Sequence, residues 1–253
     1  MTDSGFTSSG RARRLYVEAA LGPDRLIALS PGQSHYVRNV VRLKPGDEVL
    51  VFNGVDGEWR ARLELEGRAA GLMVEERVRP QAAPADLDYL FAPLKRARLD
   101  YMVQKATELG AARLRPVITE RTAVARVNFA RMRANAIEAA EQCGLVWVPE
   151  VSEPRPLAAV IAEWPADRAL VFADEAAEKA SPVGALAALR GKPIALIVGP
   201  EGGFSPRERA LLLAHAATRP ISLGPRIMRA DTACIAALAL IQALAGDWTV
   251  AAK

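Results

Sequence analysis

Two glycine-bearing loops of the chain carry the residue types best suited to hold a small ligand. The first runs from Gly199 to Gly203 after an apolar segment at residues 194–198, and the second, with Gly224, follows an apolar segment at residues 221–223. Glycine adopts positive φ without strain and lets a ligand approach the main chain closely, so Gly199, Gly202 and Gly203 can do both. Ligands of open α/β sheets bind beyond the carboxyl ends of the strands. We therefore expect the two loops to line one pocket.

Charged side chains stand within or directly after these loops. Glu201 lies in the first loop, and Arg226, Arg229 and Asp231 follow the second, just before an apolar helical stretch at residues 234–244. Cations beside an apolar helix are either placed for a ligand or engaged locally, by capping carbonyl groups or pairing with Asp231. The sequence leaves both interpretations of the arginines open, although two such loops together favour a shared site.

Several common catalytic motifs are missing from the sequence. It contains no GxGxxG, GxxxxGK[ST], GxSxG or HExxH pattern, and its only histidines are His35 and His215. Its two cysteines, Cys143 and Cys234, are far apart and outside any CxxC pair. These features argue against a dehydrogenase, a P-loop kinase, a serine hydrolase and a zinc protease. They also predict that the chain binds no metal and that both cysteines are reduced thiols.

The two loops belong to a C-terminal region in which strand and helix patterns alternate. Apolar runs bounded by turn residues predict strands at residues 87–92, 114–119, 146–151, 169–173, 194–198 and 221–223. Hydrophobic residues recur at helical spacing from Leu99 to Leu109, with Gly110 as a stop. Ser205 and Glu208 form a capping box at the start of another helix. Residues 85–253 are thus predicted to form an α/β domain with a mainly parallel sheet.

Residues 1–80 have the pattern of a small β-rich domain. Strands are expected at residues 14–17, 49–52, 58–65 and 72–74, with turns at residues 45–47 and 53–54. Ser30 followed by Pro31 predicts the start of one helix, whose buried face is expected to comprise Val37, Val40 and Val41. The cluster at residues 80–84, rich in proline and alanine, is the expected linker.

The basic residues of the chain are unevenly distributed. Its net charge is only +4, yet the excess of basic over acidic residues is +5 in residues 81–135, against +1 in residues 1–80 and −2 in residues 136–253. Two basic stretches stand out, at residues 11–14 and 95–98, and such stretches can neutralise phosphates of a nucleic acid or can simply be solvated surface. The sequence shows neither a signal peptide nor a long apolar span, so we expect a cytoplasmic protein that does not cross a membrane.

Six segments together resemble the bacterial family that methylates N3 of a uracil in 16S ribosomal RNA, within the SPOUT methyltransferase superfamily. Each segment is weak evidence alone, but the six occur in order along nearly the whole chain. They are residues 13–17 (RRLYV), 35–48 (HYVRNVVRLKPGDE), 104–110 (QKATELG), 138–144 (EAAEQCG), 199–203 (GPEGG) and 223–229 (LGPRIMR).

The resemblance implies a fold, a cofactor and partners. The fold is a PUA-like β-barrel domain over residues 1–80 followed by a SPOUT α/β domain with a C-terminal trefoil knot over residues 85–253. The cofactor is S-adenosylmethionine, and the residues expected to bind it are Leu196, Gly199, Glu201, Gly202, Leu223, Gly224, Ile227, Met228 and Ala233. The substrate is 16S ribosomal RNA or the small ribosomal subunit, and the implied assembly is a homodimer. The residues expected to contact RNA are Arg13, Arg14, His35, Arg38, Arg42, Lys95 and Arg96.

The expected chemistry is transfer of the methyl group to N3 of an unpaired uracil. Arg229 is expected to stabilise the negative charge that develops on a uracil carbonyl, and Asp231 or Glu201 to orient it or assist deprotonation. The sequence departs from the family pattern at Asp231, where glutamate is usual, at Leu145, where arginine is usual, and at Ser34, where a second histidine is common.

Three alternatives remain open from the sequence. One is another SPOUT activity, on a ribose 2′-hydroxyl or on a guanine of transfer RNA. A second is a non-catalytic RNA-binding factor for ribosome assembly. The third is a small-molecule enzyme without an RNA partner, which the two basic stretches disfavour.

Overall fold

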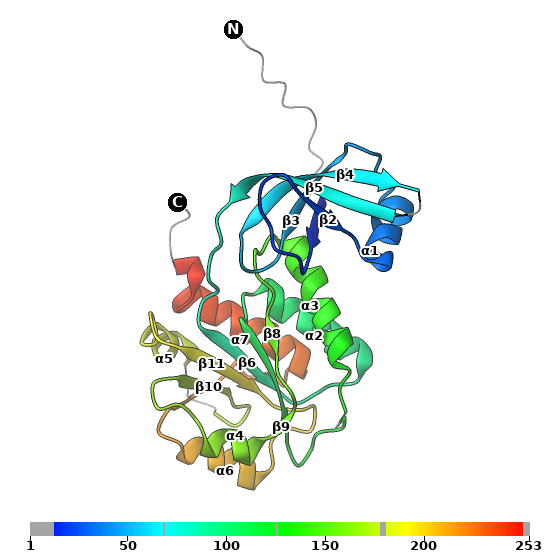
Figure 1. Cartoon of the computed structure of the whole chain (residues 1–253). Helices are drawn as coiled ribbons and strands as arrows, with labels where there is room; N and C mark the ends of the chain where they lie inside the picture. The colour runs from blue at the N-terminus through cyan, green and yellow to red at the C-terminus, as the bar shows by residue number, and fades with distance from the viewer. Residues whose placement is uncertain (1–12, 68, 125, 178–180, 250–253) are drawn as a thin grey trace. The chain divides into compact units, whose positions relative to one another are not determined.

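The computed structural model describes residues 13–67, 69–124, 126–177 and 181–249 (Figure 1). Arg11, in the first basic stretch, lies outside these residues. The chain divides into two compact units. The first unit comprises residues 1–82 together with residues 144–147, and the second comprises residues 83–143 and 148–253.

The first unit is built on a five-stranded sheet with the strand order β1-β3-β4-β5-β2. Strands β3, β4 and β5 pair antiparallel in sequence order, β1 adds to β3 in parallel, and β2 adds to β5 antiparallel. The bounds are β1 (Arg13–Tyr16), β2 (Arg25–Ala28), β3 (Glu48–Phe52), β4 (Glu58–Glu66) and β5 (Ala69–Arg79). A β-rich first domain was predicted, and the structure confirms it, adding the β2 strand that the sequence analysis missed.

Local turn chemistry explains the connections of this sheet. Asp47 Oδ2 accepts a hydrogen bond from the main-chain nitrogen of Lys44 at 2.7 Å, which closes the turn that carries Gly46. Asn53 Oδ1 accepts from the main-chain nitrogens of Val55 and Asp56 in the turn between β3 and β4. Both turns lie where the sequence predicts them.

The helical segment of the first unit begins as predicted but does not continue as a regular helix. Ser30 caps helix α1 (Pro31–His35) through a capping box with Gln33, and a π-helical turn, η1 (Tyr36–Val40), follows. Val37 is buried as expected, whereas Val40 is 61% exposed. The expected apolar face was wrong at Val40, because a π-turn has a longer period than an α-helix and rotates this valine away from the core, whereas Val41 is half-buried.

The second unit contains a parallel sheet with the strand order β12-β10-β11-β6-β7-β8, with β9 pairing separately with β7. Among the described residues, the strand pairs of this unit are all parallel, in agreement with the mainly parallel sheet that was predicted. The bounds are β6 (Leu87–Phe91), β7 (Arg113–Ile118), β8 (Glu150–Val151), β9 (Arg155–Pro156), β10 (Ala169–Ala173), β11 (Ile194–Val198) and β12 (Thr218–Ile221).

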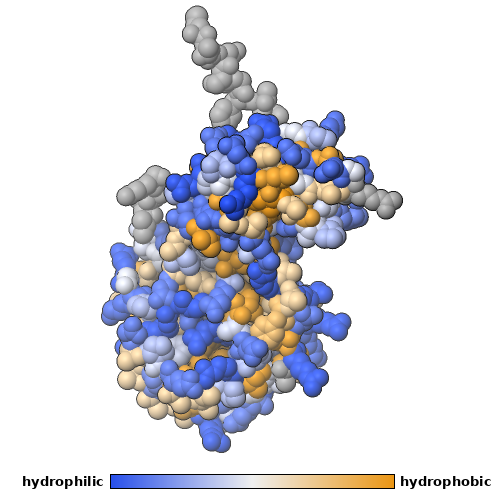
Figure 2. All heavy atoms as spheres, in the orientation of Figure 1, coloured by the Kyte–Doolittle hydropathy of each residue, from blue (hydrophilic) through white to orange (hydrophobic). Residues whose placement is uncertain are grey.

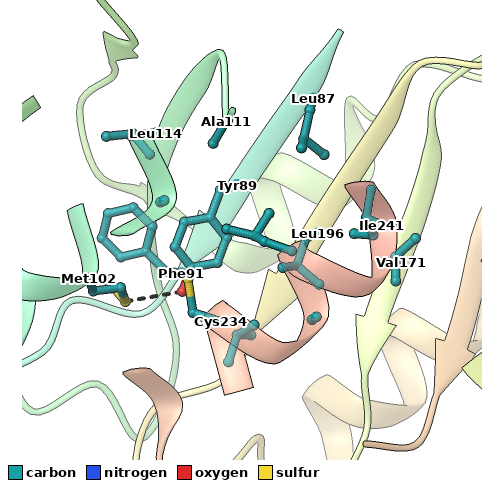
Figure 3. Close-up of a cluster of buried hydrophobic side chains, with 14 of the residues drawn as sticks. Leu87, Tyr89, Phe91, Met102, Ala111, Leu114, Val171, Leu196, Cys234 and Ile241 are labelled. Carbon is teal, nitrogen blue, oxygen red and sulfur yellow. Dashed lines mark hydrogen bonds between the residues drawn. The ribbon is translucent and has the colours of Figure 1, made fainter. Parts of the chain in front are cut away.

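Helices cover both faces of this sheet. They are α2 (Arg96–Glu108), α3 (Phe129–Cys143), α4 (Leu157–Ala162), α5 (Pro182–Ala187), α6 (Pro206–Ala214) and α7 (Ala230–Leu244), with a short 3₁₀ turn η2 (Asp247–Thr249). Alternate residues of the strands belong to two hydrophobic clusters, one shared with α2, α3, α5 and α7 and the other with α4 and α6. Figure 3 shows part of the first cluster, with Tyr89 and Phe91 of β6 next to Leu196 of β11. On the face drawn in Figure 2, hydrophilic residues cover much of each unit and hydrophobic residues form smaller areas between them.

Helix α7 is a long helix composed mainly of apolar residues. With the turn that follows, it is long and apolar enough to span a membrane by length and composition. One face of the helix is instead buried in the first cluster through Cys234, Ala237, Leu238 and Ile241. Packing of α7 into the core of the second unit accounts for its composition.

Three predicted boundaries in the second unit were wrong. The strand expected at residues 146–151 is reduced to β8, because residues 144–147 belong to the first unit. The strand expected at residues 221–223 ends at Ile221, because its partner β10 ends at Ala173, which pairs with Ile221. Helix α7 begins at Ala230, so Arg229 and Asp231 lie at a helix N-terminus and not in a loop.

Candidate active site

The two glycine-bearing loops end at the same edge of the parallel sheet. The loop after β11 begins at Gly199 and the loop after β12 begins at Ser222. Strand β10 lies between β11 and β12, so the two loops are separated by one strand, roughly 10 Å at the ordinary spacing of strands. They follow strands that are consecutive in the chain, as predicted, and face one region of the sheet edge with the end of β10 between them.

The first loop folds back under its own aromatic residue. The main-chain nitrogen of Gly203 donates to the carbonyl of Pro200 at 2.9 Å, which closes a turn over Glu201 and Gly202. A Cβ atom on Gly199 would lie 2.9 Å from the Phe204 ring, and that ring stacks edge-on against Phe172. Only Gly203 of these glycines has positive φ, +68°. Gly199 is therefore required for close approach of Phe204, and the capacity of glycine for positive φ is used at Gly203.

Two arginines from distant segments contact the turn of the first loop. Arg98 of α2 donates from Nη1 to Glu201 Oε1 at 2.8 Å. Arg121, from the loop after β7, donates from Nη1 to the carbonyl of Gly202 at 2.7 Å. The Glu201 carboxylate is thus already engaged in an ion pair, which disfavours it as a general base.

Glu208 fixes the far end of the same loop. Its buried carboxylate accepts from the main-chain nitrogen of Ser205 at 3.0 Å and completes the predicted capping box of α6. The other oxygen accepts from the main-chain nitrogen of Glu120 at 2.8 Å. One carboxylate therefore joins the start of α6 to the turn that carries Arg121.

The second loop leads directly into the N-terminus of α7. Gly224 has φ +102°, which allows the turn, and a Cβ atom there would meet nothing within 4 Å. Ile227 is 89% exposed, while Leu223 and Met228 pack against the core. Most of the predicted cofactor-binding residues of this loop therefore offer main-chain or apolar surface at the sheet edge.

Arg229 and Asp231 stand at the first turn of α7. Arg229 is the N-cap residue of this helix and is exposed to solvent. Its side chain makes no ion pair or hydrogen bond with any residue that the structure describes. Asp231 is half-buried, and its Oδ1 accepts from the main-chain nitrogen of Thr232 at 2.9 Å. Pairing of Arg229 with Asp231, the alternative left open by the sequence, is not seen among these described residues.

Leu196 and Ala233 lie beneath the loops in the core. Leu196 is fully buried in β11 and Ala233 is 7% exposed in α7. Their side chains belong to the first hydrophobic cluster, which the residues of the two loops adjoin at the sheet edge. Next to them, the Tyr89 hydroxyl lies between Met102 and Cys234 (Figure 3). Burial raises the pKa of the Cys234 thiol to about 12, with Asp231 adding to the rise and the Tyr89 hydrogen bond opposing it.

Two of the predicted RNA-contact residues lie at the same sheet edge. Lys95 and Arg96 are exposed at the start of α2, shortly after β6 ends at Phe91. Because β6 pairs in parallel with β11, its carboxyl end belongs to the edge that carries the first loop. Arg98, which the sequence analysis did not single out within this basic stretch, is the residue that reaches Glu201.

The other predicted RNA-contact residues lie in the first unit. Arg13, His35 and Arg42 are exposed, and Arg42 has the unusual φ of +60°. The His35 ring pairs with Asn39 at 2.9 Å. Arg38 is half-buried and donates to the carbonyl of Gly67 at 2.9 Å.

Arg14 is placed differently from its neighbour. Its side chain is 6% exposed and pairs with Glu58, with Nε 2.5 Å from Oε1. It also donates to the carbonyl of Leu145, so the departure from the family pattern at that position leaves a main-chain contact intact. This environment corrects the expectation for Arg14, because a buried and paired guanidinium cannot contact an RNA phosphate.

One cavity lies away from this edge of the sheet. It is lined by residues from β7 and from the segment at β8 and β9, including Arg113, Arg115, Glu150, Glu153 and Arg155. Arg113 and Arg115 both pair with the buried Asp88. These arginines are thus engaged in ion pairs within the fold, and we assign no ligand to this cavity.

Sequence reasoning missed Arg98, Arg121 and the second contact of Glu208. Arg121 is 81 residues from Gly202, and Glu120 is 88 residues from Glu208. No local pattern reports contacts over such separations. Of these residues, only Glu208 could be recognised from the local sequence, because the capping-box pattern predicts that its side chain caps a helix.

Comparisons with known proteins agree with this arrangement. A family model described as an RNA methyltransferase domain matches residues 81–242, and one described as an RNA methyltransferase PUA domain matches residues 29–69. Ribosomal RNA small subunit methyltransferase E of Rickettsia conorii is 32% identical, covering 91% of this chain and 95% of the relative. The enzyme of the same name from Synechocystis is 31% identical, covering 92% of this chain and 78% of the relative.

Solved structures show the same fold. A methyltransferase from Legionella pneumophila in complex with bound S-adenosylmethionine has a TM-score of 0.82 and 32% identity, covering 94% of this chain and all of that one. Ribosomal RNA small subunit methyltransferase E from Neisseria gonorrhoeae, also bound to S-adenosylmethionine, has a TM-score of 0.83 and 28% identity, covering 93% of this chain and 98% of that one. The two loops and the α7 N-terminus thus lie in an RNA methyltransferase fold, and the chain belongs to the ribosomal RNA small subunit methyltransferase E family.

Proposed function

We propose that this enzyme transfers the methyl group of S-adenosylmethionine to N3 of a uridine in 16S ribosomal RNA. The observation that carries the proposal is the meeting of the loops after β11 and β12 with the N-terminus of α7 at one sheet edge. Arg229, an exposed cation with no described partner, stands at this edge.

The residues at this edge fit S-adenosylmethionine. The adenine and the methionine part of this molecule need main-chain hydrogen bonds and apolar contacts more than a cluster of charges. The loops offer exposed main chain at Gly202 and Gly224, and apolar side chains at Leu223, Ile227 and Met228. When bound, S-adenosylmethionine supplies an activated methyl group whose transfer needs no metal.

The charged residues have distinct roles in the proposed reaction. Loss of the N3 proton places negative charge on the uracil carbonyls, and the guanidinium of Arg229 stabilises that charge. Asp231 stands two residues away on the first turn of α7 and orients the base or accepts its proton. Because Glu201 is paired with Arg98, we place Asp231 ahead of Glu201 as the proton acceptor.

RNA binding and assembly belong to the same proposal. Exposed Arg13 and Arg42 of the first unit, and Lys95 and Arg96 of the second, provide cations for phosphate contacts, and exposed His35 provides a ring N–H for such a contact. The exposed Ile227 supports burial of the second loop by another subunit, in keeping with the expected homodimer. We further propose that the enzyme acts in the cytoplasm, where ribosomal RNA is assembled, and that its C-terminal chain forms the knot implied by the resemblance.

Nucleoside analysis tests the proposal directly. The purified enzyme would be incubated with labelled S-adenosylmethionine and either naked 16S ribosomal RNA or small subunits that lack the modification, followed by mass spectrometry of the nucleosides. We expect 3-methyluridine as the labelled product. A labelled 2′-O-methylnucleoside or methylguanosine would instead identify another activity, and failure to bind S-adenosylhomocysteine would identify a non-catalytic RNA-binding protein.

A further inference from the structure

The Glu201–Gly202 turn of the first loop is held from two sides by side chains of remote segments. Arg98 contacts the Glu201 carboxylate from helix α2, and Arg121 contacts the Gly202 carbonyl from the loop after β7. We propose that Arg98 and Arg121 are positioning residues that fix this turn in the shape that binds S-adenosylmethionine. The inference rests on the proposed function, because it requires that the turn contacts the cofactor.

Arg121 contacts the turn with its whole side chain. Besides the 2.7 Å hydrogen bond to the Gly202 carbonyl, its aliphatic part lies against the glycine. A Cβ atom on Gly202 would be 3.6 Å from Arg121 Cδ and 3.7 Å from Arg121 Cβ. The side chain therefore covers one face of Gly202, and a ligand must approach the turn from another side.

The segment that supplies Arg121 is itself firmly held. The main-chain nitrogen of Thr119 donates to Thr122 Oγ1 at 2.8 Å, and that of Thr122 donates to the carbonyl of Thr119 at 3.1 Å. Glu120, between them, donates from its main-chain nitrogen to the buried carboxylate of Glu208 at 2.8 Å. Arg121 thus projects from a turn that is anchored to the start of α6.

This anchoring gives the contact an effect on ligand affinity. A binding loop that must be ordered when its ligand arrives loses affinity by the free energy of that ordering. A turn already fixed at both Gly202 and Ser205 avoids much of this loss. We therefore expect loss of the Arg121 contact to weaken cofactor binding more than it weakens the fold.

Arg98 is expected to have a smaller effect than Arg121. Its side chain is 39% exposed and that of Glu201 is 36% exposed, so the pair is screened by solvent and salt. Its role is to hold the Glu201 carboxylate on the α2 side of the turn.

Calorimetric titration with S-adenosylhomocysteine tests the inference. For Arg121→Ala we expect Kd to rise about tenfold, in line with loss of a charged hydrogen bond. For Arg98→Ala we expect a rise of about threefold that disappears in roughly 1 M salt. Arg121→Lys, which keeps a donor, should recover part of the affinity.

The matched control is Arg131→Ala. This change removes an exposed ion pair between Arg131 of α3 and Asp100 of α2, 2.6 Å in length, which does not touch the first loop. It should leave Kd unchanged. In methylation assays, Arg121→Ala should raise the KM for S-adenosylmethionine while kcat at saturating cofactor stays close to that of the wild type.

The outcomes separate this inference from the proposed function. If the wild-type enzyme binds S-adenosylhomocysteine and Arg121→Ala binds it equally well, the positioning role is wrong. An equal loss in Arg131→Ala would also overturn it, because the effect would then be general. If Arg121→Ala fails to fold, the test uses Arg121→Lys and Arg98→Ala. Wild-type affinity for S-adenosylhomocysteine in both of these variants would overturn the positioning role. Weaker binding by either variant, with its fold intact, would support the role. Failure of the wild-type protein itself to bind would instead contradict the proposed function.

Discussion

Glu208 Oε1 lies 2.8 Å from the main-chain nitrogen of Glu120, a residue 88 positions earlier in the chain. The same carboxylate also accepts from the main-chain nitrogen of Ser205 at the start of α6. A local helix cap is thereby also a tertiary link between the loops after β7 and β11. Because Glu208 makes both contacts, we expect its replacement to destabilise the fold around the first loop.

Replacement of Glu208 should destabilise the fold. Glu208→Ala removes both hydrogen bonds and leaves the buried main-chain nitrogen of Ser205 without this acceptor, so we expect the free energy of unfolding to fall by about 2–3 kcal/mol. Denaturant titration followed by circular dichroism measures this free energy of unfolding. Glu163→Ala, which removes an exposed pair with Arg155, should change it by less than about 0.5 kcal/mol. Equal losses in the two variants would contradict the role given to Glu208.

Arg229→Ala should reduce turnover without removing the cofactor. Loss of a cation that stabilises charge in the transition state lowers kcat by about 10²–10³-fold. Affinity for S-adenosylhomocysteine should stay near the wild-type value, which calorimetry measures. Arg226→Ala is the matched control, because Arg226 is exposed in the same loop, and it should have a much smaller effect on kcat. Near-normal turnover of Arg229→Ala with saturating RNA would refute the assignment.

Two glycine substitutions should have opposite effects on stability. Gly203 has φ +68°, and a Cβ atom there would lie 2.9 Å from Glu175 Oε1, so Gly203→Ala should cost about 1–2 kcal/mol of unfolding free energy. Gly184 lies in the short helix α5 with nothing within 4 Å of an added Cβ atom. Gly184→Ala should therefore stabilise the protein by about 0.5–1 kcal/mol. Thermal unfolding distinguishes the two, and destabilisation by both would count against the local conformations described.

The two cysteines should differ in their reactivity toward alkylating reagents. Burial is the main cause that raises the pKa of Cys234 from 9.0 to about 12, whereas Cys143 is half-buried. Because the folded state favours the neutral Cys234 thiol, its contribution to stability is fully present below about pH 9 and is lost as pH rises toward 12. We expect mass spectrometry after iodoacetamide treatment at pH 8 to show alkylation of Cys143 before Cys234. Faster modification of Cys234 in the folded protein would be inconsistent with this environment.

Arg13 and Arg14, neighbours in β1, should respond differently to replacement by alanine. Arg14→Ala leaves the buried carboxylate of Glu58 with only the partly exposed Arg79, so stability should fall by about 3 kcal/mol. Arg13 is exposed, and Arg13→Ala should leave stability within about 0.5 kcal/mol while weakening RNA binding in low salt. Denaturant titration and RNA titration at two salt concentrations give the two measurements. Equal stability of both variants would argue against the buried pair.

Local chemistry made much of the fold predictable. The N-cap at Ser30, the capping box of Ser205, the turn at Gly46 and the stop at Gly110 depend on neighbouring residues, and each is found where the sequence places it. Most strand positions followed from hydrophobic runs for the same reason. The exceptions are β2, which was missed, the strand expected at residues 146–151, part of which belongs to the first unit, and the strand end at Ile221, which depends on the length of β10.

Relations between distant segments could not be read in the same way. Nothing near residues 198 or 221 shows that β10 lies between β11 and β12, because strand order is decided by packing across the whole sheet. The different environments of Arg13 and Arg14 depend on Glu58 and Leu145, which are 44 and 131 residues from Arg14. The candidate residues of the loops could therefore be named from the sequence, but the contacts of Glu201 could not.

The short segment at residues 144–147 has a consequence for the evolution of the protein. Its carbonyl groups at Gly144 and Leu145 accept hydrogen bonds from Arg79 and Arg14 of the first unit. The chain therefore passes between the two units three times, after Ala82, after Cys143 and after Trp147. A gene fusion that joined the methyltransferase domain to a different RNA-binding domain would have to supply new hydrogen-bond partners for this segment. We therefore expect the two domains to be inherited together and not to recombine independently.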